Sequence, residues 1–146
     1  MINRKINSIF VGELMIMKES ELLEFKSSFS LHKEIIQTLS AFANKHGGTI
    51  LVGLNDRGEL SGMEIGKKTI EDFVVRLRQH TDPVLYPSIT NRTFGLGEIV
   101  EITIKESEQK PVLAFQKAFT RIGRATVQMS NAEMRELFKK NILCRN

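Results

Sequence analysis

The sequence predicts an α+β, or mixed α/β, fold in which a mixed β-sheet with hairpins is covered by about three helices. Its 146 residues are enough for one ordinary domain with a real core. Strand-like and helix-like periodicities are mixed along the chain, and short turns join many of the strand-like stretches, which favours hairpins. We expect a single domain over 1–146, with 1–18 as an irregular apolar lead-in.

The first predicted strand covers 22–26. Leu23 and Phe25 alternate with Glu24 and Lys26, so the two pairs are expected on opposite faces of the strand. The strand is therefore expected to bury one face and to present charged groups on the other.

A helix is predicted over about 31–46. Ser30 is a candidate cap, and Gly47 and Gly48 are expected to end the helix. Because a histidine lies on the helix's apolar stripe, a core or capping role is expected for it. The stripe consists of Ile35, Leu39, Phe42, Ala43 and His46.

The next segment, TILVGL at 49–54, is a continuous apolar run, which is typical of a strand buried on both faces. The turn NDRG at 55–58 is expected to lead into a short strand at 60–63. Thr69 and Asp72 have the spacing of a capping box, so a second helix is predicted there.

The remainder is rich in predicted strands. Gly95 and Gly97 suggest a hairpin, and a last helix is expected to begin at a capping box of Ser130 and Glu133. The predicted strands cover 89–94, 99–104, 112–115 and 119–129.

Composition narrows the classes of function. The net charge of +4 permits a nucleic-acid partner, although ordinary solubility explains it equally well. The one cysteine, Cys144, excludes an internal disulfide and a cysteine-rich zinc site, and it fits a reducing compartment. No apolar run approaches the roughly 20 residues of a membrane span, and we predict no signal peptide. A cytoplasmic protein without a membrane partner is therefore expected.

Three acids stand at positions where a site could form. Asp56 follows the predicted buried strand, at the end of an α/β sheet where ligands tend to bind, and Glu24 lies on the polar face of the first strand. If the two strands pair, both acids could converge with Glu19, and carboxylates so placed favour a hard divalent cation. Lys26 would add a cation for a phosphate. The alternative is that all four are solvated surface charges.

The last part of the chain is basic. Arg121 and Arg124 flank Gly123, where the backbone could approach a phosphate closely. Phe115 and Phe119 could be stacking platforms for bases, but their alternation favours the core. The basic residues are Lys117, Arg121, Arg124, Arg135, Lys139, Lys140 and Arg145. The alternative is a solvated strand face and an ordinary basic terminal helix.

Three blocks of sequence, taken in order, resemble the Schlafen AlbA_2 domain family. They are ESELLEFKSS, LSAFANKHGGTILVGLNDRGELSGM and FTRIGRATVQMS. The resemblance runs from about Glu19 to Phe138, and the AFAN-x-x-GG segment followed by an acidic turn is its most specific part. The family is described as nucleic-acid-binding and also occurs in many prokaryotic regulators.

The resemblance implies a nuclease centre of two glutamates and an aspartate. The family positions fall on Glu19, Glu24 and Asp56, with the lysine that follows the second glutamate on Lys26. These acids would hold Mg²⁺ or Mn²⁺. Two departures stand out: the chain lacks the cysteines of the larger Schlafens' zinc site, and it has one lobe where those proteins have two. A homodimer could rebuild the two-lobed groove.

The leading hypothesis is therefore a nucleic-acid-binding protein with divalent-metal-dependent endonuclease activity on tRNA-like RNA or single-stranded nucleic acid. Lys117, Arg121 and Arg124 would contact the phosphate backbone. One alternative is a non-catalytic DNA- or RNA-binding regulatory module. A protein that serves only structural interactions is a third class.

Overall fold

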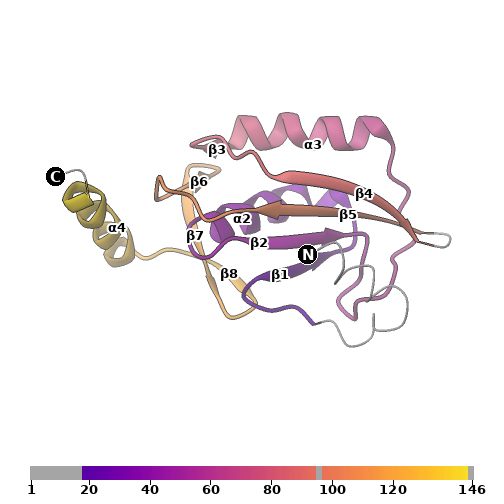
Figure 1. Cartoon of the computed structure of the whole chain (residues 1–146), viewed down its shortest axis with the longest axis horizontal. Coiled ribbons are helices and arrows are strands. Elements are labelled where there is room, and N and C mark those ends of the chain that lie inside the picture. Colours follow the sequence, from indigo (N-terminus) through magenta and orange to yellow (C-terminus); the bar gives the residue numbers. More distant parts are fainter. Residues whose placement is uncertain (1–17, 95–96, 145–146) are drawn as a thin grey trace.

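The described part of the chain forms two four-stranded sheets, with strand orders β1-β2-β5-β4 and β3-β6-β7-β8 (Figure 1). This computed structural model describes residues 18–94 and 97–144. The expected lead-in up to residue 17, Gly95 and Arg145 lie outside the described residues. The elements in chain order are β1 (Leu23–Lys26), the short 3-10 helix η2 (Phe29–Leu31), α2 (His32–Ala43), β2 (Gly48–Val52), α3 (Lys67–His80), β3 (Thr81–Asp82), β4 (Ser88–Phe94), β5 (Gly97–Ile104), β6 (Leu113–Ala114), β7 (Lys117–Ile122), β8 (Ala125–Gln128) and α4 (Asn131–Cys144).

The first sheet is mixed. Strands β1 and β2 run parallel, with Glu24 opposite Ile50, while β5 pairs antiparallel with both β2 and β4. Residues opposite each other in register share a face, so Glu24 faces the same side of the sheet as Ile50. That side belongs to the main core, whereas Phe25 and Leu51 pack in a smaller cluster on the other side. The expected mixed α+β fold is confirmed, although the strands divide between two sheets.

Helix α2 contacts both sheets and forms the middle layer of the protein. Its buried residues lie almost all around the helix, instead of on the single stripe that the sequence suggested. Small side chains allow the second sheet to approach closely, and the hydroxyls of Thr38 and Thr126 lie 3.0 Å apart. The buried residues of α2 are Ile35, Ile36, Thr38, Leu39, Ser40, Ala41, Phe42 and Ala43.

The AFAN-x-x-GG segment fastens the end of α2 to both sheets. The Asn44 amide donates to the carbonyls of Val112 (2.9 Å) and Phe119 (2.8 Å), and the Val112 N–H donates back to the Asn44 carbonyl oxygen (2.6 Å). On the other side, the Phe42 ring lies so close to Gly48 that a Cβ there would come within 2.6 Å of it. Phe42, Asn44 and Gly48 of the motif therefore each have a structural role.

Two predicted helix caps are wrong and one is confirmed. Helix α3 begins at Lys67 with Gly66 as its N-cap, without a side-chain cap, so Thr69 and Asp72 form no capping box. Ser28, not Ser30, caps the turn that precedes α2. The expected capping box of α4 is present, because Ser130 and Glu133 bond each other's backbone N–H groups.

The predicted strand at 60–63 is also wrong, because there the chain makes only an isolated bridge between Leu54 and Leu60. The turn at 55–58 is confirmed, with Asn55 accepting the Gly58 N–H at 3.0 Å. The expected hairpin over 89–104 is present as the antiparallel pair β4 and β5.

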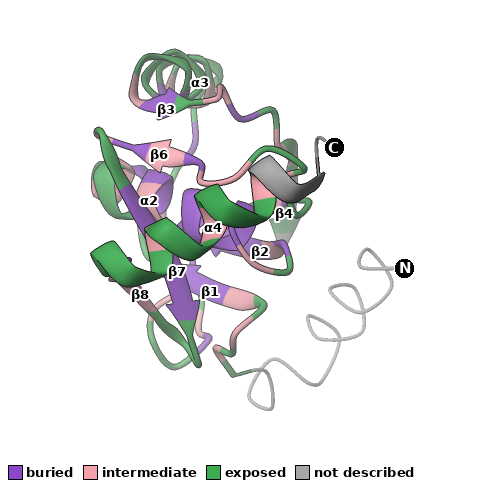
Figure 2. Cartoon of the chain, turned by 90° about the vertical axis from the view of Figure 1, so that its left-hand side faces the viewer, coloured by how far each residue is buried: buried purple, intermediate pink, exposed green. Residues whose placement is uncertain are grey.

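Helices α3 and α4 are largely exposed (Figure 2). Helix α3 buries mainly Phe73 and Leu77, while α4 projects from one end of the molecule with Phe138 about half exposed (Figure 1). Within 18–94 and 97–144, no helix is long and apolar enough to cross a membrane.

Candidate functional site

The first two predicted acids do meet. A tight turn, in which Ser20 and Leu23 exchange backbone hydrogen bonds of 2.9 and 3.4 Å, folds the segment before β1 back along the strand. This turn brings the Glu19 carboxyl beside that of Glu24, near enough for a hydrogen bond between the two carboxyl groups to raise the pKa of Glu24. Two carboxyl groups can bond in this way only when one of them carries a proton.

Glu24 is the buried member of the pair, with 6% of its surface exposed. Burial raises the pKa of its carboxyl from 4.5 to about 7, and the hydrogen bond and negative charge of Glu19 act in the same direction. The positive charges of Arg121 and Lys26 oppose this rise without cancelling it. At neutral pH the Glu24 carboxyl therefore exchanges readily between its neutral and ionised forms.

Arg121 of β7 lies directly beside Glu24, and its side chain is 1% exposed. The guanidinium is satisfied within the protein, because carbonyl oxygens of the Ser20–Leu23 turn accept hydrogen bonds from it. Its neighbours are Glu24 (3.6 Å), the carbonyl oxygens of Ser20 (2.6 Å) and Glu21 (3.4 Å), the Thr126 hydroxyl (3.0 Å) and the Phe42 ring (4.8 Å to the centroid).

This position corrects the expectation that Arg121 contacts a phosphate. A guanidinium buried among carbonyl acceptors, a carboxyl group and an aromatic face has no side open to a ligand. Arg121 instead joins the first sheet to the second across the edge of α2. The sequence reasoning missed its partners Ser20 and Thr126, because both are ordinary surface-type residues; Ser20 also lies far from it along the chain, while Thr126 is opposite it on the neighbouring strand β8.

Asp56 does not join the two glutamates. It lies in the exposed turn beyond the end of β2, where the Asn55 side chain accepts the N–H groups of Arg57 (2.9 Å) and Glu59 (3.0 Å). Glu19 precedes β1, at the opposite end of the parallel strand pair. Among the described residues, no three His, Cys, Asp or Glu side chains lie close enough to hold a metal ion. The expected three-acid site is therefore not formed in this structure.

Lys26 lies on the same face of β1 as Glu24. Its ammonium group pairs with Glu34 of α2 at 3.1 Å, and the lysine side chain is 18% exposed. To contact a phosphate, Lys26 would have to leave this carboxylate.

The other two predicted basic residues are exposed. Lys117 begins β7, and Arg124 lies in the turn between β7 and β8, next to Gly123. Lys117 therefore stands at the start of β7, and Arg124 lies just beyond its end, three residues after the buried Arg121. Both remain available to an anionic ligand.

The expected core or capping role of His46 is wrong. Its side chain is 64% exposed and lies beyond the end of α2. The imidazole nitrogens are each 3.8 Å from a carboxylate, that of Glu21 on one side and that of Glu106 on the other.

Comparison with known protein families shows which family the chain belongs to. The family described as "Schlafen, AlbA_2" matches residues 19–130, well over half of the chain. The chain belongs to the Schlafen AlbA_2 family. This membership associates it with nucleic acids, and the expected family is thereby confirmed. No curated protein matches the chain closely enough to show a relationship.

Solved structures share the fold of this Schlafen AlbA_2 chain. The DIP2311 protein of Corynebacterium diphtheriae matches with a TM-score of 0.63 and 16% identity, over 92% of this chain and 27% of that one. The N-terminal domain of a protein from Nitrosomonas europaea, named as related to the ATP-dependent DNA helicase RecG, matches with a TM-score of 0.58 and 23% identity. That match covers 83% of this chain and 91% of the other. The chain thus spans about a quarter of the length of the Corynebacterium protein.

Proposed function

We propose that this Schlafen AlbA_2 chain binds nucleic acid through the exposed cations of its second sheet. The observation that carries the proposal is the family match over residues 19–130. A net charge of +4 and the exposure of Lys117 and Arg124 at the two ends of β7 support it. Phosphate contacts of this kind supply affinity without reading sequence.

In this proposal Arg121 acts indirectly. By bonding the Ser20–Leu23 turn and packing on Phe42, it fixes β7 against the first sheet. The strand then holds the exposed cations at its ends in fixed positions. Loss of Arg121 would reduce stability first and binding only as a consequence.

The test is the salt dependence of binding. Fluorescence anisotropy with labelled RNA and DNA strands is expected to give an affinity that falls steeply as salt rises. Replacing Arg124 by Ala is expected to reduce the slope by about one phosphate contact. Arg57→Ala, which removes an exposed arginine from the turn after β2, is the matched control and is expected to keep the slope. A flat response to salt in the unaltered protein would overturn the proposal.

A second candidate function is metal-dependent endonuclease activity, and the Glu19–Glu24 pair is the observation that favours it. Mg²⁺ is usually held by one or two carboxylates, with water completing its shell, so two adjacent carboxyl groups suit Mg²⁺ or Mn²⁺. Asp56 takes no part in this version of the site. The bound ion would activate a water molecule and neutralise charge on a phosphodiester.

The chain's own residues would set the pH range of such a site. Because the Glu24 pKa is about 7, its carboxyl must lose a proton before it can ligate a cation. Affinity for the metal is therefore expected to rise between about pH 6 and pH 8. Arg121 stays beside Glu24 and would limit the negative charge that the pair presents.

The activity test uses labelled tRNA, single-stranded DNA and duplex DNA with Mn²⁺ or Mg²⁺, and isothermal titration with Mn²⁺ alone measures the site directly. Glu24→Gln is expected to abolish both cleavage and Mn²⁺ binding, while Asp56→Asn keeps both. Cleavage that persists in Glu24→Gln, or a loss in Asp56→Asn, would remove this site assignment. If the protein binds nucleic acid but does not cleave it, only the binding function remains supported.

A homodimer, which would place two copies of β7 around one ligand, also belongs to this proposal. Light scattering after gel filtration is expected to give twice the monomer mass. A stable monomer would mean that one copy binds nucleic acid by itself.

A further inference from the structure

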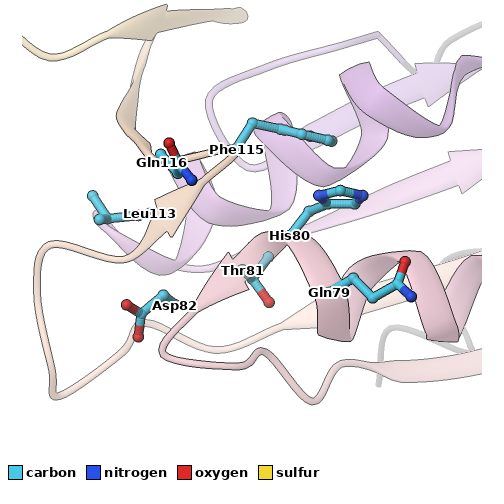
Figure 3. A pocket seen from close by; sticks show the side chains of 7 residues that line it. All are labelled: Gln79, His80, Thr81, Asp82, Leu113, Phe115 and Gln116. Atoms are coloured by element: carbon cyan, nitrogen blue, oxygen red, sulfur yellow. The ribbon is translucent and has the colours of Figure 1, made fainter.

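A cavity of about 470 Å³ lies where the end of α3 meets the β6–β7 hairpin (Figure 3). Gln79 and His80 line it from α3, Asp82 from β3, and Phe115 and Gln116 from the hairpin turn. None of these residues has a role in the site around Glu24. The cavity therefore needs an explanation of its own.

Two rings form one wall of the cavity. The imidazole of His80 and the ring of Phe115 are stacked, with centroids 4.6 Å apart and planes inclined by 22°. The ammonium group of Lys33 lies 5.6 Å from the centroid of the Phe115 ring. Both rings are only partly buried, so the cavity has an aromatic wall.

The backbone beneath Phe115 is strained. Ala114 pairs with Lys117, so the hairpin turns through Phe115 and Gln116 alone, with φ angles of 52° and 67°. Such turns strongly favour Asn and Gly, and a bulky residue in the left-handed region is uncommon. The strained turn is anchored to α3 because the Phe115 N–H donates to the His80 carbonyl at 2.8 Å. Strain kept in place this way is a feature of ligand sites.

The polar groups around the rings suit the edge of a base. The amides of Gln79 and Gln116 can both donate and accept hydrogen bonds, and the Asp82 carboxylate can accept one from an amino group. Exposed Lys33 lies beside the Phe115 ring, and exposed Lys117 follows the hairpin turn two residues after Phe115, so both are available to the phosphates of a bound strand. Lys117 also begins the strand to which the phosphate contacts are assigned.

We propose that this cavity binds an unpaired nucleobase of a single-stranded nucleic acid. The base stacks on the His80–Phe115 pair, and its edge faces the two glutamines and Asp82. The inference rests on the proposed nucleic-acid binding and specifies the form of the ligand, because a base within a duplex cannot offer its face to a protein ring. The two exposed lysines contact the backbone of the strand.

The experiment compares single strands that carry the same phosphates with and without bases. Affinity is measured by anisotropy for the unaltered protein, Phe115→Leu and Phe119→Leu. The last is the matched control, because Phe119 belongs to the main core and does not line the cavity. The unaltered protein is expected to bind the strand with bases about fivefold or more tightly than the abasic strand. Phe115→Leu is expected to lose that preference and keep its salt slope, while Phe119→Leu keeps both.

Fluorescence of a strand containing 2-aminopurine gives a second readout, because stacking quenches it and Phe115→Leu should relieve the quenching. Circular dichroism establishes that each variant is folded. Equal affinity for the two strands in the unaltered protein, or an unchanged preference in folded Phe115→Leu, would overturn the base site. Salt-dependent binding with no preference for the strand that carries bases would still support the phosphate contacts. Failure to bind either strand would remove both proposals.

Discussion

The buried carboxyl of Glu24 should make the stability of this protein depend on pH in a defined window. Its pKa is about 7 in the folded chain, against the ordinary glutamate value of 4.5 that the unfolded chain restores. The folded state therefore holds more protons than the unfolded state between these values, so stability falls as pH rises through the window. The contribution is fully present below pH 4.5 and lost above about pH 7. Glu24→Gln keeps the shape of the side chain and removes the titration.

The expected size follows from the pKa change. Each pKa unit corresponds to about 1.4 kcal/mol, so a rise from 4.5 to about 7 amounts to roughly 3 kcal/mol. Between pH 4.5 and pH 8 the free energy of unfolding of the unaltered protein should fall by about this much relative to Glu24→Gln. Other titrating groups are shared by the two proteins and cancel in the comparison.

Urea denaturation followed by circular dichroism, at pH 4.5 and pH 8, measures the difference. Glu71→Gln, which removes an exposed carboxyl from α3, is the control and should follow the unaltered protein. If Glu24→Gln showed the same pH dependence as the unaltered protein, the reasoning about burial and the Glu19 hydrogen bond would be refuted. The predicted direction would be wrong if the unaltered protein lost stability as the pH fell from 8 to 4.5 while Glu24→Gln did not.

Three further predictions, one of them for a single substitution and two for a pair of substitutions, test the fold. Asn44→Ala should lower the unfolding free energy by about 3 kcal/mol or more, because it leaves two buried carbonyls and one N–H without their hydrogen-bond partners. Urea denaturation measures this loss, and a loss under about 1 kcal/mol would contradict the role of Asn44 in joining α2 to the second sheet. Gly53→Ala should cost more than about 2 kcal/mol, since its Cβ would come within 2.4 Å of a carbonyl oxygen at φ 116°. Gly62→Ala, at φ 77° with open space around it, should cost only about 1 kcal/mol; equal losses in thermal melts would reject the steric argument. Arg121→Met should cost about 3–5 kcal/mol, whereas Arg124→Ala should leave the melting temperature nearly unchanged.

Much of the fold was predictable because each element has a local signal. The apolar run at 49–54 and the alternating residues of the 99–104 strand reflect their burial directly. The caps of the first two helices were not predictable to the residue, because a serine or threonine near a helix start competes with neighbours for the same N–H groups. The division into two sheets also has no local signal. It depends on α2 being buried on both sides.

The candidate site was predictable only in part. The nearness of Glu19 and Glu24 follows from a short turn, which sequence can suggest. The position of Asp56 depends on strand register, because β2 carries it past the end of β1 and away from the turn that holds Glu19. The burial of Arg121 could not be inferred, since its partners come from a turn about a hundred residues earlier and from α2. Charge counts cannot distinguish a surface arginine from one enclosed by carbonyls.

The middle position of α2 has a consequence for how the protein is made on the ribosome. The first sheet is complete once residue 104 has emerged, but the strands that cover the other side of α2 end only at Gln128. Until then the small and apolar residues of that side face water, a state prone to aggregation. A nascent chain that stalls in this interval would be the form that chaperones bind, even though most of its secondary structure has already formed.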